Sequence, residues 1–206
     1  MWPHLIINKL HNSKLELTTS LYKGTSLNPK SVEIYQTYHG FLTLAIEQVK
    51  HNGLLLLPTV SDEYMNHDLE DKKTLLLYGI STKEINSKIF SSPYITIRHY
   101  AKVAGIPLDE LTIGKYSLGA HLERWSIPTI PSDSLDMIRG IFSEKYSHGY
   151  KSNWRNKQNL NFRYTMKKNM SAVLVKIPHF YTLSLMREYY TDVFARALKD
   201  FLQQEY

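Results

Sequence analysis

Hydrophobic residues recur at every third or fourth position in two long stretches of the chain, and this spacing places them on one face of an α-helix. The first stretch starts at Asn28-Pro29 and stops before Asn52-Gly53, residue pairs that are typical of a helix start and a helix end. The second stretch begins after Pro178 and continues to Leu202. The pattern predicts one amphipathic helix after residue 28 and either one or two helices at the C-terminal end, where Thr191-Asp192 could cap a second helix.

Other stretches have the patterns that are typical of β-strands. Residues 171–177 alternate with a period of two and end before Pro178, and residues 159–167 alternate in the same way. Residues 54–57 and 74–78 are short apolar runs bounded by Gly, Pro and polar residues, which suits buried strands. Residues 3–22 have the pattern of a hairpin. Strands and helices in this arrangement predict the α+β class.

The segment 127–133 contains two prolines beside serine and aspartate, a composition that marks turns and domain boundaries. We therefore expect a mixed N-terminal domain over residues 1–131 and a basic DNA-binding and dimerisation region over residues 132–206. Residues 95–131 resemble the opening of helix-turn-helix modules of the MerR and excisionase type. Gly114 and Gly119 interrupt the segment where the recognition helix should lie, so we expect this region to pack as scaffold.

A strand that ends in Lys176, Ile177 and Pro178 and is followed by helix resembles the ribbon-helix-helix family of DNA-binding transcriptional regulators, which includes plasmid conjugation regulators. The resemblance implies an obligate homodimer in which two chains pair these strands antiparallel and place the two-stranded ribbon in the major groove of double-stranded DNA. It implies that the C-terminal end of the chain is a ribbon-helix-helix-like module in which Ala172, Leu174 and Lys176 face the DNA. Among these three side chains, the Lys176 ammonium is the one that could donate a hydrogen bond to a base edge.

The formal charge of +6 is distributed unevenly along the chain. The 43 residues from Lys145 to Arg187 carry nine basic side chains and no Asp or Glu, and aromatic residues are interleaved with them. Such a pattern favours contact with a phosphate backbone. From this segment we expect phosphate contacts by Lys151, Arg155, Lys157 and Lys168, base contacts by Arg163 and Lys176, and a further DNA contact by Lys167.

The composition of the chain limits which bonds, bound groups and cellular locations we expect. The chain has no cysteine, which excludes disulfides and thiolate metal ligands. No run approaches the roughly 18 apolar residues that a membrane span needs, and we expect a cytoplasmic protein without a membrane partner. The acidic loop at residues 62–71 lacks the geometry of a metal site, and the sequence contains none of the common catalytic or nucleotide-binding motifs, so we expect no metal, no cofactor and no catalytic residue.

These observations predict a dimeric, sequence-specific DNA-binding regulator of transcription that is not an enzyme. Two alternatives stay open. His99, His121 and His148 lie near basic residues, and one of them could act as the general base of a metal-independent RNA-processing endonuclease. The protein could also be an interaction scaffold with an incidental positive face.

Overall fold

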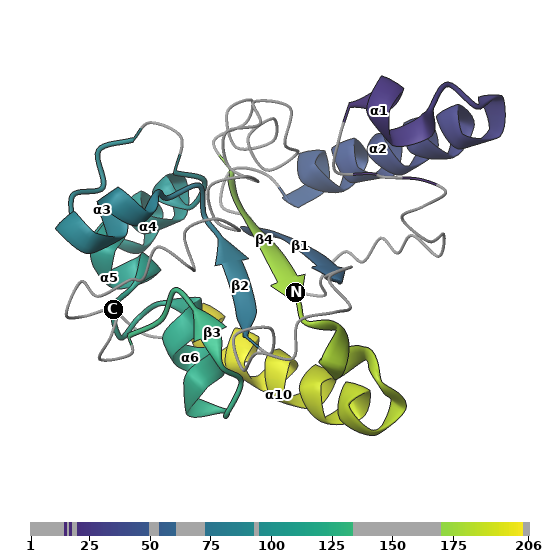
Figure 1. Cartoon of the computed structure of the whole chain (residues 1–206). Helices are drawn as coiled ribbons and strands as arrows, with labels where there is room; N and C mark the ends of the chain where they lie inside the picture. The colour runs from purple at the N-terminus through teal and green to yellow at the C-terminus, as the bar shows by residue number, and fades with distance from the viewer. Residues whose placement is uncertain are drawn as a thin grey trace.

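In the described part of the chain, four strands form one mixed sheet in the order β1-β4-β2-β3 (Figure 1). The strands are β1 (Leu54–Val60), β2 (Thr74–Leu77), β3 (Thr129–Ile130) and β4 (Ser171–Ile177). β4 runs parallel to β1 and antiparallel to β2, and β2 runs parallel to β3. With helices before, between and after these strands, the predicted α+β class is confirmed.

The computed structural model describes residues 15, 17, 20–49, 54–60, 73–92, 95–133 and 170–203. Its helices are α1 (Leu21–Thr25), α2 (Pro29–Val49), α3 (Thr82–Ser87), α4 (Arg98–Ala104), α5 (Leu108–Thr112), α6 (Leu118–Arg124), the 3-10 helix η3 (His179–Thr182) and α10 (Ser184–Gln203). The predicted strand at residues 159–167 lies outside these ranges, as does most of the predicted hairpin, whose last residues Leu21 and Tyr22 begin α1 instead.

Local sequence explains where several helices begin. The Asn28 side-chain oxygen accepts hydrogen bonds from the backbone N–H groups of Lys30 and Ser31, at 3.1 and 3.3 Å, so it caps α2 where Pro29 starts the helix. Ser81 and Glu84 form a complete capping box at the start of α3. The predicted helix start at Asn28-Pro29 is thus confirmed by the bonds that its cap makes.

β4 is an inner strand of the sheet, because it has hydrogen-bonded neighbours on both edges. Leu174 lies level with Leu57 of β1 on one side and with Leu77 of β2 on the other. All five residues from Ser171 to Val175 are buried, so both faces of the strand are covered. The expectation of a ribbon strand that pairs with a second chain is therefore wrong, because the backbone groups such pairing needs are already used within the chain.

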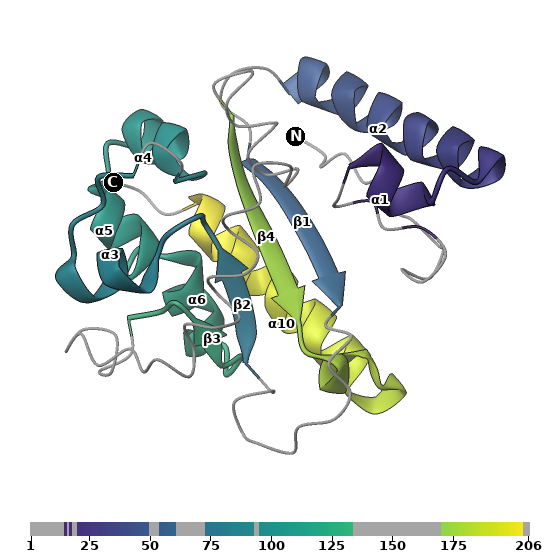
Figure 2. The ribbon, with the colours of Figure 1, turned by 45° about the horizontal axis from the view of Figure 1, so that its top comes forward.

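α10 lies across the sheet behind β2 and β4, as Figures 1 and 2 show, and completes the main core. The Tyr190 hydroxyl of α10 is 2.9 Å from the Thr74 hydroxyl of β2, and the Phe201 ring stacks on the Tyr100 ring at 5.6 Å. α10 is one continuous helix after Ser184, and the Thr191 hydroxyl donates to the Arg187 carbonyl within it, so Thr191 does not cap a second helix. The alternative of two helices that divide at Thr191 is therefore excluded.

The sheet and the main core join residues from both sides of the expected domain boundary at 131–132. β4 and α10 follow that position in the sequence, while β1, β2, β3 and α3 to α6 precede it. At the boundary itself, Gly119 of α6 lies so close to the Pro131 carbonyl oxygen that a Cβ atom at residue 119 would collide with it. The described residues therefore pack as one unit across this point.

α1 and α2 form a helical pair beside the β1 edge of the sheet (Figure 2). Tyr35 of α2 is buried against Leu15 and Leu17. In the second half of α2, Leu42 and Ile46 are buried with Met170, the residue that precedes β4. One face of α2 is thus committed to the chain's own core.

Candidate nucleic-acid interface

The start of β4 is hydrogen-bonded directly to the start of α4. The Ala172 backbone N–H donates to the Thr96 carbonyl at 3.1 Å, and the Tyr100 backbone N–H donates to the Ser171 hydroxyl at 2.7 Å. Ser171 is buried and Tyr100 is half-buried at this bond. The acid-free segment of the sequence therefore enters the described structure at Met170, beside the first turn of α4.

α4, which forms this junction, and α3 both carry exposed basic residues. Lys83 and Lys88 belong to α3 and its C-terminal cap, and Arg98 and Lys102 belong to α4. All four residues are exposed. We refer to these four residues as the α3–α4 basic surface. Figures 1 and 2 show α3 and α4 on the same side of the sheet, beyond the end of β2.

Arg98 holds the segment that connects the two helices. One of its terminal guanidinium nitrogens donates to the Phe90 carbonyl at 3.0 Å and to the Ser92 carbonyl at 2.7 Å. These bonds leave the cation at the surface while they tie the end of the α3 region to the first turn of α4. The Arg98 side chain thus connects the segment that follows α3 to α4.

The one carboxylate within residues 82–104, that of Glu84, is engaged inside the structure. One of its oxygens accepts from the Ser81 N–H at 3.0 Å and from the Ser81 hydroxyl at 2.9 Å, and the other accepts from the Ser92 N–H at 3.0 Å. Four basic residues and this single acid give residues 82–104 a net charge of +3. Acidic side chains resume in α5, where Asp109 and Glu110 occupy the first turn.

The three residues of β4 that were expected to contact DNA differ in their exposure. Ala172 is 0% exposed and Leu174 is 6% exposed, so the expectation that they touch DNA is wrong. They are buried because β4 lies inside the sheet, and the alternating pattern alone did not reveal that both of its faces are covered. Lys176 is partly exposed but lies at the other end of β4 from α4. The remaining expected contacts, Lys151, Arg155, Lys157, Arg163, Lys167 and Lys168, lie outside the described residues.

The helix-turn-helix-like segment is part of the core. All residues from Leu118 to Leu122 of α6 are buried, and a helix buried over five consecutive residues cannot enter a DNA groove. Its capping residue Ser117 is buried as well, with the side chain accepting from the Ala120 N–H at 3.0 Å. The expectation that this segment packs as scaffold is confirmed for α6, whereas α4 of the same segment has Arg98 and Lys102 exposed.

The histidines that suggested nuclease chemistry do not form a common group among the described residues. His121 is buried, and its ring meets the Phe201 ring edge-on at 6.0 Å, which is a packing contact. His99 is partly exposed on α4, and His148 lies outside the described residues. In the ranges that the structure describes, no three His, Asp or Glu side chains are placed to bind a metal ion.

The perturbed titratable groups belong to the core and not to the α3–α4 basic surface. Burial raises the pKa of Tyr190 to about 12, although the hydrogen bond to Thr74 opposes the shift. Burial also raises the pKa of Tyr78, whose hydroxyl has no hydrogen-bond partner among the described residues. These tyrosines stay protonated and packed, and none of them is positioned as an acid or base at the surface.

Sequence reasoning did not select the four residues of the α3–α4 basic surface. The available signal was the excess of basic over acidic residues between positions 82 and 104, together with a capping box that engages the single acid. Among the helices that the structure describes, none combines the length and the hydropathy that a membrane span requires. Comparison with protein-family models, curated proteins and solved structures finds no match to this chain.

Proposed function

We propose that the protein binds double-stranded DNA through the phosphate backbone and acts as a regulator of transcription. The observation that carries the proposal is the hydrogen-bonded junction between α4 and the start of β4, through the Tyr100 N–H and the Ser171 hydroxyl. It brings the point where the acid-free segment enters the fold next to the α3–α4 basic surface. The described part of the acid-free segment, residues 170–187, begins at this junction.

Electrostatics supports phosphate contact as the main source of affinity. Each basic side chain that neutralises a phosphate releases condensed counterions, so the affinity falls steeply as the salt concentration rises. The segment from Lys145 to Arg187 supplies nine basic groups, and Lys83, Lys88, Arg98 and Lys102 add four. The Glu84 carboxylate, which accepts hydrogen bonds from Ser81 and Ser92, offsets one of these four added charges.

The proposal assigns no base contact to the buried part of β4. Direct readout requires side chains that reach donor and acceptor groups in a groove. In this proposal, Arg163 and Lys176 remain the expected base contacts, and Lys151, Arg155, Lys157 and Lys168 the expected phosphate contacts.

The test is a binding titration with labelled duplex DNA across a series of salt concentrations, with RNA of the same sequence as competitor. We compare Lys83→Gln/Lys102→Gln with a matched double variant, Lys23→Gln/Lys199→Gln, which removes two exposed charges from α1 and α10. The first variant should weaken binding and lower the slope of log affinity against log salt by up to about 2 units, since each phosphate contact contributes about 0.9. The second should leave the slope unchanged.

Three other results would contradict the proposal or favour one of the alternatives. If both double variants weaken binding equally, net charge is responsible and the α3–α4 basic surface is not a binding site. Preference for the RNA competitor, or its cleavage, would favour the RNA-processing alternative. Absence of binding to either nucleic acid at low salt would favour the scaffold alternative.

A further inference from the structure

The exposed side of α2 carries apolar residues in the spacing of a coiled-coil seam. Ile34, Phe41 and Leu44 are 40%, 57% and 56% exposed. They lie on one line along the helix whose positions are separated alternately by four and three residues: Lys30, Ile34, Thr37, Phe41, Leu44 and Gln48. This is the repeat by which one helix packs along another. We refer to this line of six residues as the α2 seam.

The α2 seam is distinct from the face that α2 uses within its own chain. Tyr35, Leu42 and Ile46 are the buried residues of that face, and they pack against Leu15, Leu17 and Met170. A helix that needs only one apolar face normally carries polar residues on the remainder of its surface. α2 instead presents large apolar side chains on a second line.

We propose that the α2 seam is a dimer interface, in which α2 of a second copy of this chain packs antiparallel against it. In this arrangement Ile34 lies opposite Leu44 of the second copy, and Thr37 lies opposite Phe41 of the second copy. Lys30 lies opposite Gln48 at each end. In each pair the two residue numbers average to 39. One twofold axis that passes α2 at the level of residue 39 therefore relates all of the pairs at once.

The residues near the midpoint fit a close approach of two helices. Gly40 is one residue from the axis, and a Cβ atom added to it would have no neighbour within 4 Å. Nothing in the described part of the chain therefore requires a glycine here, although glycine weakens a helix interior. At the axis, the missing side chain would let the two backbones approach, while each Phe41 ring packs over a small Thr37 side chain.

Charge complementarity favours the antiparallel over the parallel arrangement. Lys30 is near the N-terminal end of α2, and Glu47 is near its C-terminal end. Antiparallel packing places Lys30 between Glu33 of its own helix and Glu47 of the second copy, at both ends of the seam. Parallel packing would place the two Lys30 side chains, which lie on the seam, opposite each other, with like charges opposed.

The size of the interface sets the expected strength. The seam spans one helix of 21 residues. An interface of this kind is at the small end of the range for specific complexes, which predicts a dimer that forms at micromolar concentration and dissociates on dilution. This dimer does not involve β4 and is independent of the proposed DNA binding.

Analytical ultracentrifugation of the full chain over a concentration series tests the proposal. The weight-average mass should rise from the chain mass of 24.0 kDa toward twice that value. Phe41→Glu should raise the dimer dissociation constant at least about tenfold. The control Leu185→Glu introduces the same charge at a residue of α10 that is 91% exposed, and it should leave the constant unchanged.

A cysteine experiment tests the orientation, because the natural chain has no cysteine and each variant carries a single thiol. When Ile34→Cys and Leu44→Cys chains are mixed and oxidised, the mixed disulfide should exceed either homodisulfide. The Gln36→Cys variant, whose thiol is on another side of α2, should form little disulfide. Three results would overturn the proposal: a monomer at every concentration, dominance of the Ile34→Cys homodisulfide, or a Phe41→Glu variant that lowers Tm without changing the mass.

Discussion

At the scale of single residues, Tyr190 links the protonation of one hydroxyl to the stability of the core. Its ring is buried between Tyr181 and Phe194, at centroid distances of 4.5 and 5.8 Å. The phenol can hold its hydrogen bond to Thr74 without charge, whereas a buried phenolate would lose solvation. Burial is therefore the main reason that the pKa of Tyr190 rises from 10.0 to about 12.

This shift predicts loss of stability in alkali. Between pH 10 and 12 the unfolded chain releases the Tyr190 proton while the folded protein keeps it, so the free energy of unfolding falls as pH rises, by about 2 to 3 kcal/mol from this group. Tyr190→Phe should cost about 1 kcal/mol near neutral pH through loss of the Thr74 bond, but it should flatten the alkaline decline. Urea unfolding at a series of pH values measures both effects. Tyr22→Phe, on an exposed residue, is the control, and an unchanged alkaline decline in Tyr190→Phe would contradict the assignment.

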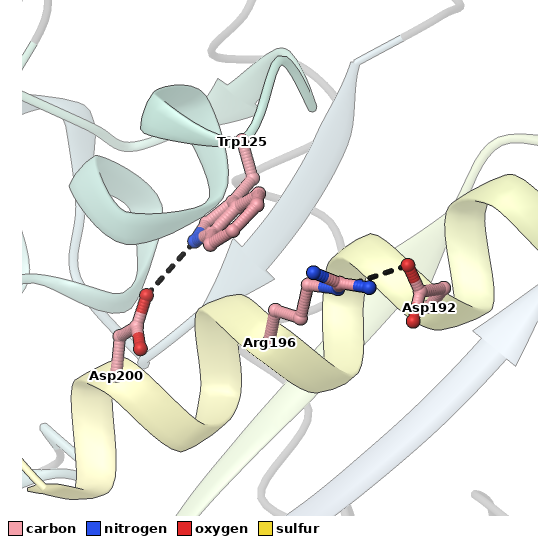
Figure 3. A network of polar contacts seen from close by, with 4 residues as sticks. All are labelled: Trp125, Asp192, Arg196 and Asp200. Atoms are coloured by element: carbon pink, nitrogen blue, oxygen red, sulfur yellow. Dashed lines mark hydrogen bonds and ion pairs between the residues drawn. The ribbon is translucent and has the colours of Figure 1, made fainter.

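At the scale of elements, a polar network fastens α6 to α10 along their exposed edge (Figure 3). The Trp125 indole N–H donates to the Asp200 carboxylate at 2.9 Å, and the Arg196 guanidinium lies over the Trp125 ring at 5.6 Å. Arg196 also forms an ion pair with Asp192 at 2.9 Å, with both side chains more than half exposed. Below this edge, the buried contact of His121 with Phe201 joins the same two helices.

Because the network is at the surface, we expect unequal contributions from its members. Asp200→Ala should lower the free energy of unfolding by about 1 kcal/mol, since it removes the partner of the indole N–H. Asp192→Ala should cost less than about 0.5 kcal/mol, because an exposed ion pair within one helix contributes little. Chemical denaturation of both variants, with a double-mutant cycle between Trp125→Phe and Asp200→Ala, measures the coupling. An effect of Asp192→Ala as large as that of Asp200→Ala would contradict this ranking.

At the scale of the whole molecule, the sheet depends on two parts of the chain that are far apart in the sequence. β4 lies between β1 and β2 in the sheet. Among the described residues, no segment of residues 1–131 joins β1 to β2 in its place. Without β4 and α10 the core would lose Val173, Val175, Tyr190, Val193 and Phe201, all of them buried.

A fragment of residues 1–131 therefore should not fold alone. We expect it to show no cooperative thermal transition and to exchange its backbone amides rapidly, whereas the full chain unfolds cooperatively. Adding residues 132–206 as a separate peptide should restore the transition, at least in part. A cooperative transition in the isolated fragment would instead support the division into two domains at residue 131.

Features governed by neighbouring residues were predictable from the sequence alone. The start of α2 at Pro29, the capping box from Ser81 to Glu84 and the limits of β4 at Ser171 and Ile177 all agree with the structure. Caps and strand periodicity depend on side chains within about four positions of one another, so the sequence contains all the information that they need.

The position of β4 and the location of the candidate site were decided by tertiary structure. The same alternation suits an edge strand or a central strand, and the difference lies in partners more than 90 positions away, such as Leu54 beside Ser171 and Leu77 beside Leu174. Burial on both faces removed Ala172 and Leu174 from any contact with DNA. The same packing placed α4, which carries Arg98 and Lys102, beside the start of β4. A local pattern specifies what an element is, whereas the elements that cover it depend on contacts between distant parts of the chain.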